Sequence, residues 1–265
     1  MLPALAFPMI DPVLVQIGPF AIRWYALAYI AGIVIGWRVA RRLVQWAPKV
    51  ATAEQVDDYV TWVTLGIIAG GRLGYVLFYR PGYYVTAPWE ALYVWQGGMS
   101  FHGGALGVMV ATWWFARRNG LDWVAFADRV VCVVPIGLFF GRLANFINGE
   151  LWGRVTDVPW AMVFPTGGPE PRHPSQLYQA FLEGACLFAL LMLLARSERI
   201  RARPGMLAGV FLAGYGVARS IGELFRQPDA HLGFLVAGAT MGQLLSVPMI
   251  LAGTWLILRA KERHG

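Results

Sequence analysis

The stretch GRLANFINGELWGR, residues 141–154, carries charged and amide side chains at the end of a long apolar run. Arg142 and Asn145 lie three residues apart, so a helix presents both on one face. Asn148 and Glu150 then favour a helix end near a membrane surface. An ionisable side chain at the centre of a bilayer costs about 2.5–3.5 kcal/mol. This cost predicts that Arg142 meets an acidic partner, a polar cavity or an anionic ligand.

The whole chain has the composition of a membrane protein. Of its 265 residues, 57% are apolar and 14% are charged, with a net charge of +7. A soluble domain is about 45–50% apolar and about 25% charged. The basic residues separate apolar runs and form no single patch, which argues against a nucleic-acid partner. Cys132 and Cys186 lie in apolar stretches, so we expect neither a disulfide framework nor a metal site. Residues 1–16 lack a basic leader and a cleavage site, so we expect no cleaved signal peptide.

Seven segments are long and apolar enough to be membrane-spanning helices, which need about 20 residues each. They are about Phe20–Leu43, Asp57–Tyr79, Gly97–Arg117, Trp123–Ile147, Ser175–Ala195, Gly205–Phe225 and Ala239–Leu258. The sequence therefore predicts an all-α, polytopic membrane protein. We expect residues 1–265 to form a single transmembrane domain.

The connections between these segments alternate in positive charge. The richer connections carry Arg38, Arg41, Arg42 and Lys49; Arg117 and Arg118; Arg196, Arg199, Arg201 and Arg203; and Arg259, Lys261 and Arg263. The poorer connections carry Arg80, Arg154, Arg172 and Arg226. The positive-inside rule places the richer set in the cytoplasm. The N-terminus is then outside (periplasmic in a bacterium) and the C-terminus is cytoplasmic.

Two of the outer connections are long. The first, an arm of about residues 80–96, holds five Tyr and Trp side chains and suits the aromatic belt at a membrane surface. The second, about residues 149–174, contains five prolines. A structureless loop of that length is uncommon, so we expect a small folded head on the outer face.

The sixth predicted span carries a polar stripe. At 100° per residue, Tyr215, Arg219, Glu223 and Arg226 fall within about 80° of arc. Arg219 and Glu223 have the i, i+4 spacing of a helical ion pair. One interpretation is a structural pair that joins helices, and the other is a stripe that lines a functional cavity.

The third predicted span opens with GGMSFHGG, residues 97–104, around a lone histidine. His102 lies at the predicted depth of Glu150, near the outer surface. It is either a structurally satisfied histidine or a functional one. Arg23 and Arg72 are interpreted as anchors or as support for the site, and Arg154 as an interfacial anchor.

Four ordered motifs resemble those of the bacterial prolipoprotein diacylglyceryl transferase family. They lie at residues 97–104, 141–154, 172–178 and 219–229, and the resemblance covers nearly the whole chain. It implies an enzyme of the bacterial plasma membrane that moves the diacylglyceryl group of phosphatidylglycerol onto a cysteine thiol. That cysteine lies in the lipobox of a prolipoprotein signal peptide. A thioether forms, glycerol phosphate leaves, and no metal or organic cofactor takes part.

The resemblance also implies which residues form the site. The catalytic residues are His102, Arg142 and Arg219, and the substrate-binding residues are Arg142, Asn145, Glu150, Arg219, Glu223, Tyr25 and Tyr215. The arginines would bind the phosphate, whereas His102 would either deprotonate the thiol or orient the headgroup. Ala144 departs from the glycine frequent in the family, but both residues are small.

Two rival functions start from the same charges. Arginine and glutamate inside a membrane also mark the paths of transporters and channels. Transporters usually show internal repeats, and here only residues 71–75 and 141–145 resemble one another. A purely structural scaffold is the second rival, and the insertion cost of its charges argues against it.

Overall fold

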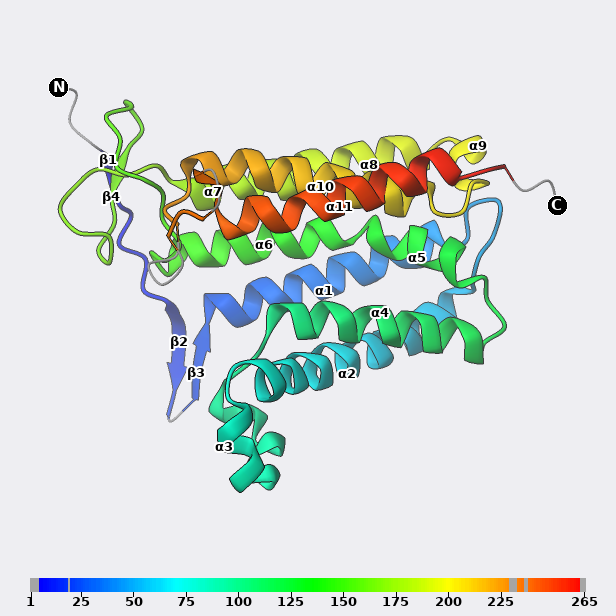
Figure 1. Ribbon diagram of the computed structural model, residues 1–265, viewed down its shortest axis with the longest axis horizontal. Helices are drawn as coiled ribbons and strands as arrows, with labels where there is room; N and C mark the ends of the chain where they lie inside the picture. The colour runs from blue at the N-terminus through cyan, green and yellow to red at the C-terminus, as the bar shows by residue number, and fades with distance from the viewer. Residues whose placement is uncertain (1–4, 19, 229–232, 236–237, 263–265) are drawn as a thin grey trace. The chain divides into compact units, whose positions relative to one another are not determined.

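The computed structural model describes residues 5–18, 20–228, 233–235 and 238–262, which are mostly helical. They divide into two compact units, residues 1–40 with 128–265, and residues 41–127. The long helices, labelled in Figure 1, are α1 (Trp24–Leu43), α2 (Ala53–Phe78), α4 (Phe101–Arg118), α5 (Trp123–Val131), α6 (Val134–Ile147), α8 (Leu187–Ala195), α10 (Met206–Phe225) and α11 (Met241–Arg259).

Helices occupy each of the seven predicted segments. Four of the described helical stretches are long and apolar enough to cross a membrane, namely Ala53–Phe78, Trp123–Ile147, Ser175–Ala195 and Met241–Arg259. This supports a helical membrane protein.

The prediction that the first helix begins at Phe20 was wrong. Residues Phe20–Arg23 form strand β3, which pairs antiparallel with β2 (Val13–Ile17). Gly18 adopts a φ of 58° in the turn between the strands, a conformation that glycine adopts without steric penalty. The β-branched residues of this segment favour strands, so the helix begins only at Trp24. The chain is therefore not entirely α-helical.

The fifth predicted span is an interrupted helix. It begins as α7 (Ser175–Gln179), continues as the π-helix η3 (Ala180–Cys186) and ends as α8. A Cβ at Gly184 would lie 2.6 Å from Cβ and 2.8 Å from Cα of Phe139 on α6. The glycine thus lets η3 lie directly against α6, and this contact places the side chain before it, Glu183.

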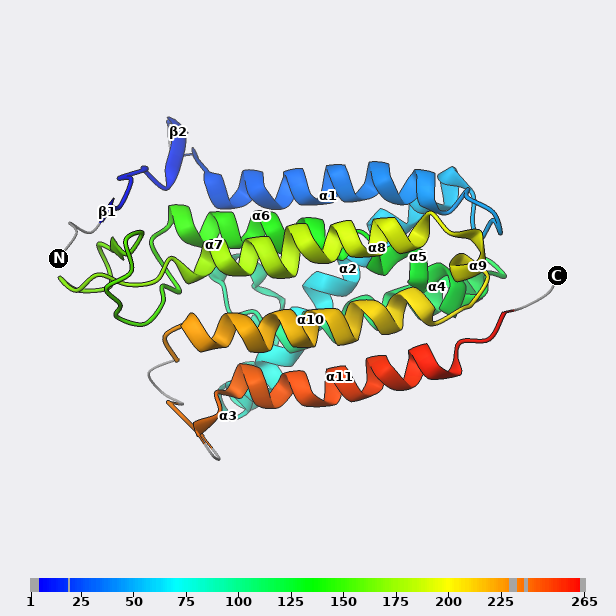
Figure 2. The same ribbon diagram turned by 90° about the horizontal axis from the view of Figure 1, so that it is seen from above.

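Helices α10 and α11 lie side by side in both Figure 1 and Figure 2. Their closest approach is made by small residues: a Cβ at Gly209 would lie 2.7 Å from the carbonyl oxygen of Gly253. The start of α10 is fixed by the buried Asp128, whose carboxylate accepts hydrogen bonds from the amides of Gly205 (2.9 Å) and Ala208 (2.8 Å). This contact satisfies amides that a helix N-terminus leaves unpaired.

The segment around residues 149–174 is tied together by short backbone pairings. Strand β4 (Met162–Val163) pairs in parallel with β1 (Leu5–Ala6), and isolated bridges join Gly153 to Arg226 and Val155 to Arg172. The short helix α9 (Glu198–Arg201) follows α8.

In the second unit, α2 packs on α4 through facing glycines, because a Cβ at Gly74 would lie 2.8 Å from Cα of Gly103. The arm after α2 consists of α3 (Pro81–Thr86) and the 3-10 helices η1 (Pro88–Leu92) and η2 (Val94–Gln96). Arg72 is buried, and its guanidinium donates to the carbonyls of Ala91 (2.9 Å) and Glu90 (2.7 Å). Arg72 therefore holds the arm, as expected for an anchor.

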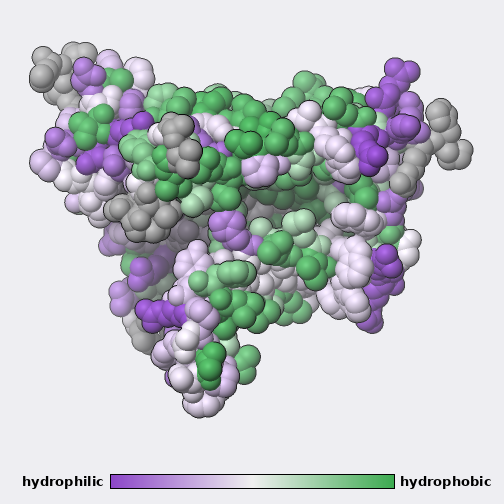
Figure 3. Space-filling view, in the orientation of Figure 1, coloured by the Kyte–Doolittle hydropathy of each residue, from purple (hydrophilic) through white to green (hydrophobic). Residues whose placement is uncertain are grey.

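The surface of the first unit matches a lipid environment. Figure 3 shows hydrophobic residues gathered over α10 and α11 and hydrophilic residues near α9. The exposed apolar side chains of α11 include Leu244, Leu251, Trp255 and Leu258. Such a surface is rare in soluble monomers, and lipid would cover it.

Candidate active site

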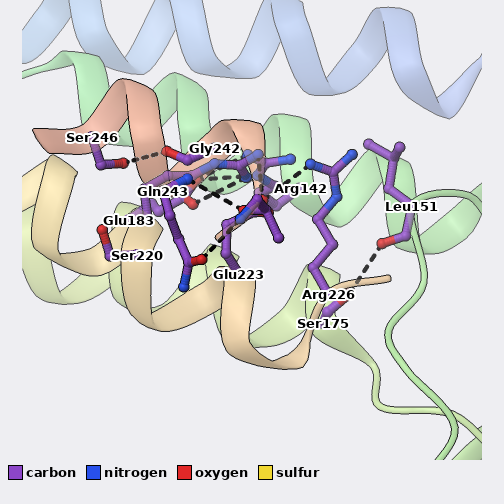
Figure 4. A network of polar contacts seen from close by, with 12 residues as sticks. Arg142, Leu151, Ser175, Glu183, Ser220, Glu223, Arg226, Gly242, Gln243 and Ser246 are labelled. Carbon is purple, nitrogen blue, oxygen red and sulfur yellow. Dashed lines mark hydrogen bonds and ion pairs between the residues drawn. The ribbon is translucent and has the colours of Figure 1, made fainter. Parts of the chain in front are cut away.

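Two arginines from different helices converge on one buried glutamate in the first unit. Glu183, fully buried on η3, accepts hydrogen bonds at Oε2 from Nε (3.2 Å) and Nη2 (3.1 Å) of Arg142 on α6. Its Oε1 lies 3.6 Å from Nη1 of Arg219 on α10. Figure 4 shows Arg142 and Glu183 within this network. The carboxylate therefore sits between the two guanidinium groups.

A second carboxylate continues the network along α10. Oε1 of Glu223 lies 2.7 Å from Nη2 of Arg219 and 3.2 Å from Nη1 of Arg226. Its Oε2 accepts a hydrogen bond of 2.6 Å from the hydroxyl of Thr240. The spacing of Arg219 and Glu223 correctly predicted their ion pair. Arg142, Glu183, Arg219, Glu223 and Arg226 are called the arginine cluster below.

Arg142 and Arg219 are partly exposed, although the glutamates that they contact are buried. Their side chains are 15% and 14% exposed, whereas those of Glu183 and Glu223 are 0% and 3% exposed. The two arginine side chains therefore keep some exposed surface, whereas the carboxylates that they contact have almost none. Guanidinium groups bind phosphate oxygens in a bidentate manner, so this arrangement suits an anionic ligand.

Basic side chains outnumber acidic ones within the arginine cluster, which holds three arginines and two glutamates. A guanidinium group in a site of low dielectric attracts an anion more strongly than the same charge in water. The cluster is therefore suited to an anionic ligand.

Asn145 and Glu150 bind each other at the end of α6. Nδ2 of Asn145 donates to Oε1 of Glu150 at 2.8 Å, and the amide of Glu150 donates to the carbonyl of Asn145 at 3.1 Å. Gly149, with a φ of 64°, makes the turn between them. Nε2 of the buried Gln176 donates to the carbonyl of Glu150 at 2.6 Å. This helix end is thus rigidly held beside α7.

The two tyrosines expected at the site lie in the same unit. Tyr25 on α1 pairs with Tyr29, with ring centroids 5.1 Å apart. Tyr215 on α10, one turn before Arg219, stacks on Phe211 with ring centroids 6.0 Å apart.

His102 belongs to the second unit. It lies exposed in the first turn of α4, where the hydroxyl of Ser100 accepts a hydrogen bond of 3.2 Å from the amide of Gly103. Its part in the site stays a prediction. Arg23, at the end of β3, is exposed. Asp229, the last residue of the fourth motif, lies outside the described residues.

The motif at residues 172–178 forms a packed corner next to α10. Nδ1 of His173 lies 3.2 Å from the hydroxyl of Tyr178, and both rings pack on Phe225. Burial and the nearby guanidinium of Arg154 lower the pKa of His173 below its ordinary value. Arg154 also donates to the backbone carbonyls of Arg226 (3.1 Å) and Glu223 (3.0 Å). Arg154 therefore holds the end of α10, in keeping with an anchoring role.

Three buried side chains of the fifth segment were missed by sequence reasoning. Gln176, Gln179 and Glu183 are all fully buried. Neither polar atom of Gln179 has a hydrogen-bond partner among the described residues. One signal was available, because Glu183 is the sole acidic residue between Ser175 and Ala195.

Together, the fold and the cluster define a helical membrane protein with a positively charged site suited to an anionic ligand. The sequence profile of the family described as "Prolipoprotein diacylglyceryl transferase" matches residues 12–259. The chain belongs to this family, and it is a transferase.

Similar proteins agree with this assignment. A phosphatidylglycerol–prolipoprotein diacylglyceryl transferase of Gluconacetobacter diazotrophicus is 60% identical over 99% of this chain and 95% of its own length. Relatives of the same name from Paramagnetospirillum magneticum and Azospirillum brasilense are 62% and 58% identical, each over 98% of this chain. The matched regions span 97% and 98% of these two relatives' own lengths.

Proposed function

We propose that this chain transfers the diacylglyceryl group of phosphatidylglycerol to the lipobox cysteine of a prolipoprotein in the bacterial plasma membrane. The observation that carries the proposal is the arginine cluster, in which Arg142 and Arg219 converge on Glu183 and leave a positive site. The printed names of the relatives state the same donor and acceptor.

The reaction is a substitution at the lipid glycerol carbon. The cysteine thiolate attacks this carbon, so that an S–C bond forms and the C–O bond to phosphate breaks. The electron pair of the broken bond moves to the phosphate oxygen, and glycerol phosphate leaves. The thiol proton goes to a base, for which His102 is proposed, with headgroup orientation as its alternative role.

Arg142 and Arg219 would stabilise the charge that develops on the leaving phosphate. Fixed donors in a site shielded from water require no reorganisation during the reaction, which makes them effective. Glu223 would hold Arg219 through its 2.7 Å ion pair. Asn145 and Glu150 would contact the headgroup from the end of α6, and Tyr25 and Tyr215 are proposed as further substrate-binding residues.

The finer architecture is also a proposal. Seven spans, an outer N-terminus and a cytoplasmic C-terminus account for the alternating charge of the connections. The whole chain would act as one catalytic domain, with the arm and the head of residues 149–174 outside. The relatives named above are transferases, and no observation favours the rival functions of a transporter or channel.

A transfer assay tests the proposed function. Purified protein in phosphatidylglycerol vesicles is incubated with a synthetic lipobox peptide, and mass spectrometry follows its cysteine. We expect a mass increase equal to one diacylglyceryl group, no increase for a peptide with serine in place of the cysteine, and almost none for Arg142→Ala. Failure of the unaltered protein to modify the peptide under varied lipid and detergent conditions would overturn the proposal.

A further inference from the structure

Glu183 is the best-placed side chain that the proposed mechanism does not use. Both of its oxygens face arginines, at 3.1–3.2 Å from Arg142 and 3.6 Å from Arg219, and it has no exposed surface. A carboxylate so buried is costly unless it is paired. A site that only had to bind phosphate tightly would be better without it, because it competes with phosphate for both guanidinium groups.

Glu183 changes the charge that a phosphate bound at Arg142 and Arg219 would meet. It lowers the charge beside these two arginines by one unit, and a neutral side chain in its place would raise that charge by one. The phosphate of phosphatidylglycerol is a phosphodiester with a single negative charge. The leaving glycerol phosphate is a phosphomonoester, whose second ionisation lies near pH 6, so it carries close to two negative charges at neutral pH.

We propose that Glu183 is a positioning and specificity-determining residue, which fixes the two arginines and matches the site to a monoanionic phosphodiester over a dianionic phosphomonoester. The inference rests on the proposed function, since it takes glycerol phosphate as the leaving product. Glu183 thereby favours binding of the donor lipid and release of the product from the same arginines.

Competition experiments on the purified full-length protein separate the two charges. The competitors are glycerol 1-phosphate, a dianion near pH 8, and glycerophosphoglycerol, a phosphodiester monoanion that carries the same glycerol group. Inhibition constants are measured in the lipobox-peptide assay for the unaltered protein and for Glu183→Gln. The neutral amide keeps the size of the side chain and raises the site charge by one.

We expect Glu183→Gln to lower the inhibition constant of glycerol 1-phosphate, relative to that of glycerophosphoglycerol, by about tenfold or more. Glu183→Asp keeps the charge and should retain the original ratio even if its turnover falls. Asp57→Asn removes a carboxylate from an ion pair with Arg41 in the second unit, and it should leave the ratio unchanged. A loss of fold or packing alone would weaken the binding of both competitors and would not favour the dianion.

Each outcome decides the inference. Equal changes for both competitors in Glu183→Gln would overturn it while leaving the proposed function intact. If that variant does not fold, as judged by gel filtration, or has no measurable turnover, Glu223→Gln makes the same charge change beside Arg219 and must show the same preference for the dianion. If the unaltered protein transfers no diacylglyceryl group at all, the proposed function fails, and the inference fails with it.

Discussion

At the scale of single residues, we expect phosphate binding by Arg142 to need the shape of its guanidinium group as well as its positive charge. Nε and Nη2 both donate to one oxygen of Glu183, which orients the rest of the guanidinium fork. We expect Arg142→Lys to keep the charge but lose the fork, and so to lower kcat/KM for phosphatidylglycerol by roughly 10²-fold.

The measurement is steady-state transfer over a range of lipid fractions in vesicles. Arg41→Lys is the matched control, because Arg41 forms a half-exposed ion pair with Asp57 at the end of α1. Its kcat/KM should stay close to that of the unaltered protein. Unchanged lipid dependence in Arg142→Lys would contradict a bidentate contact between Arg142 and phosphate.

His173 gives a prediction about pH. The fold lowers its pKa below 6.5 through burial and the charge of Arg154, so the folded protein favours the neutral ring. The unfolded chain then binds the proton at higher pH, and stability falls as pH decreases from about 6.5 toward the folded pKa.

Thermal unfolding midpoints at about pH 7.5 and about pH 5 measure this contribution. We expect the unaltered protein to lose more stability between the two than His173→Gln, which does not titrate at that position. Equal losses in the two proteins would show that His173 contributes nothing to the pH dependence.

The sequence alone identified those site residues whose charge stands out within a single apolar segment. Arg142 and the Arg219–Glu223 pair were visible because charge inside an apolar run is costly, and their spacing predicted a shared face. Glu183 was missed, although it is the partner of both arginines. It lies 41 residues from Arg142, and periodicity along one helix contains no information about which faces of two helices meet.

At the scale of elements, the π-helix depends on one glycine. A Cβ at Gly184 would meet the backbone of Phe139 at 2.8 Å, so η3 and α6 would have to separate. We expect Gly184→Ala to destabilise the protein by about 1–3 kcal/mol and to lower turnover, because the Arg142–Glu183 contact joins the same two elements.

Gly137→Ala on α6 is the matched control, since no atom lies within 4 Å of the Cβ position at Gly137. It should be neutral or stabilising by up to about 1 kcal/mol. Denaturation in detergent micelles and the transfer assay provide the two readouts. Equal behaviour of the two alanine variants would contradict a packing role for Gly184.

The elements themselves were largely predictable, and their irregularities were not. A helix lies within each of the seven ranges that hydropathy selected, because a run of apolar residues is a property of composition. The strand at residues 20–23 and the π-helix within Ser175–Ala195 escaped prediction. Both depend on neighbouring elements, β2 in one case and α6 in the other, which hydropathy along the chain does not describe.

At the scale of the whole molecule, the alternating charge of the connections predicts how the chain crosses the membrane. Thirteen basic residues lie in the proposed cytoplasmic set and four in the outer set, and this bias fixes orientation in short connections. Two helical segments, α7–α8 and α4, are the most useful for testing this arrangement. The α7–α8 segment is one of the four described stretches that are long and apolar enough to span a membrane, whereas α4 is not one of them.

Single cysteines placed at each end of these segments measure the topology. In a Cys132→Ser, Cys186→Ser background, we expect Gly82→Cys and Asp157→Cys to react with a membrane-impermeant maleimide on intact spheroplasts. Asn119→Cys and Glu198→Cys should react only after lysis, because they lie in the basic connections after α4 and α8. All four parent positions are exposed, so burial does not block labelling. Reaction of Gly82→Cys and Asn119→Cys from the same side would show that α4 does not cross the membrane, and a reversed pattern at all four positions would reverse the proposed orientation.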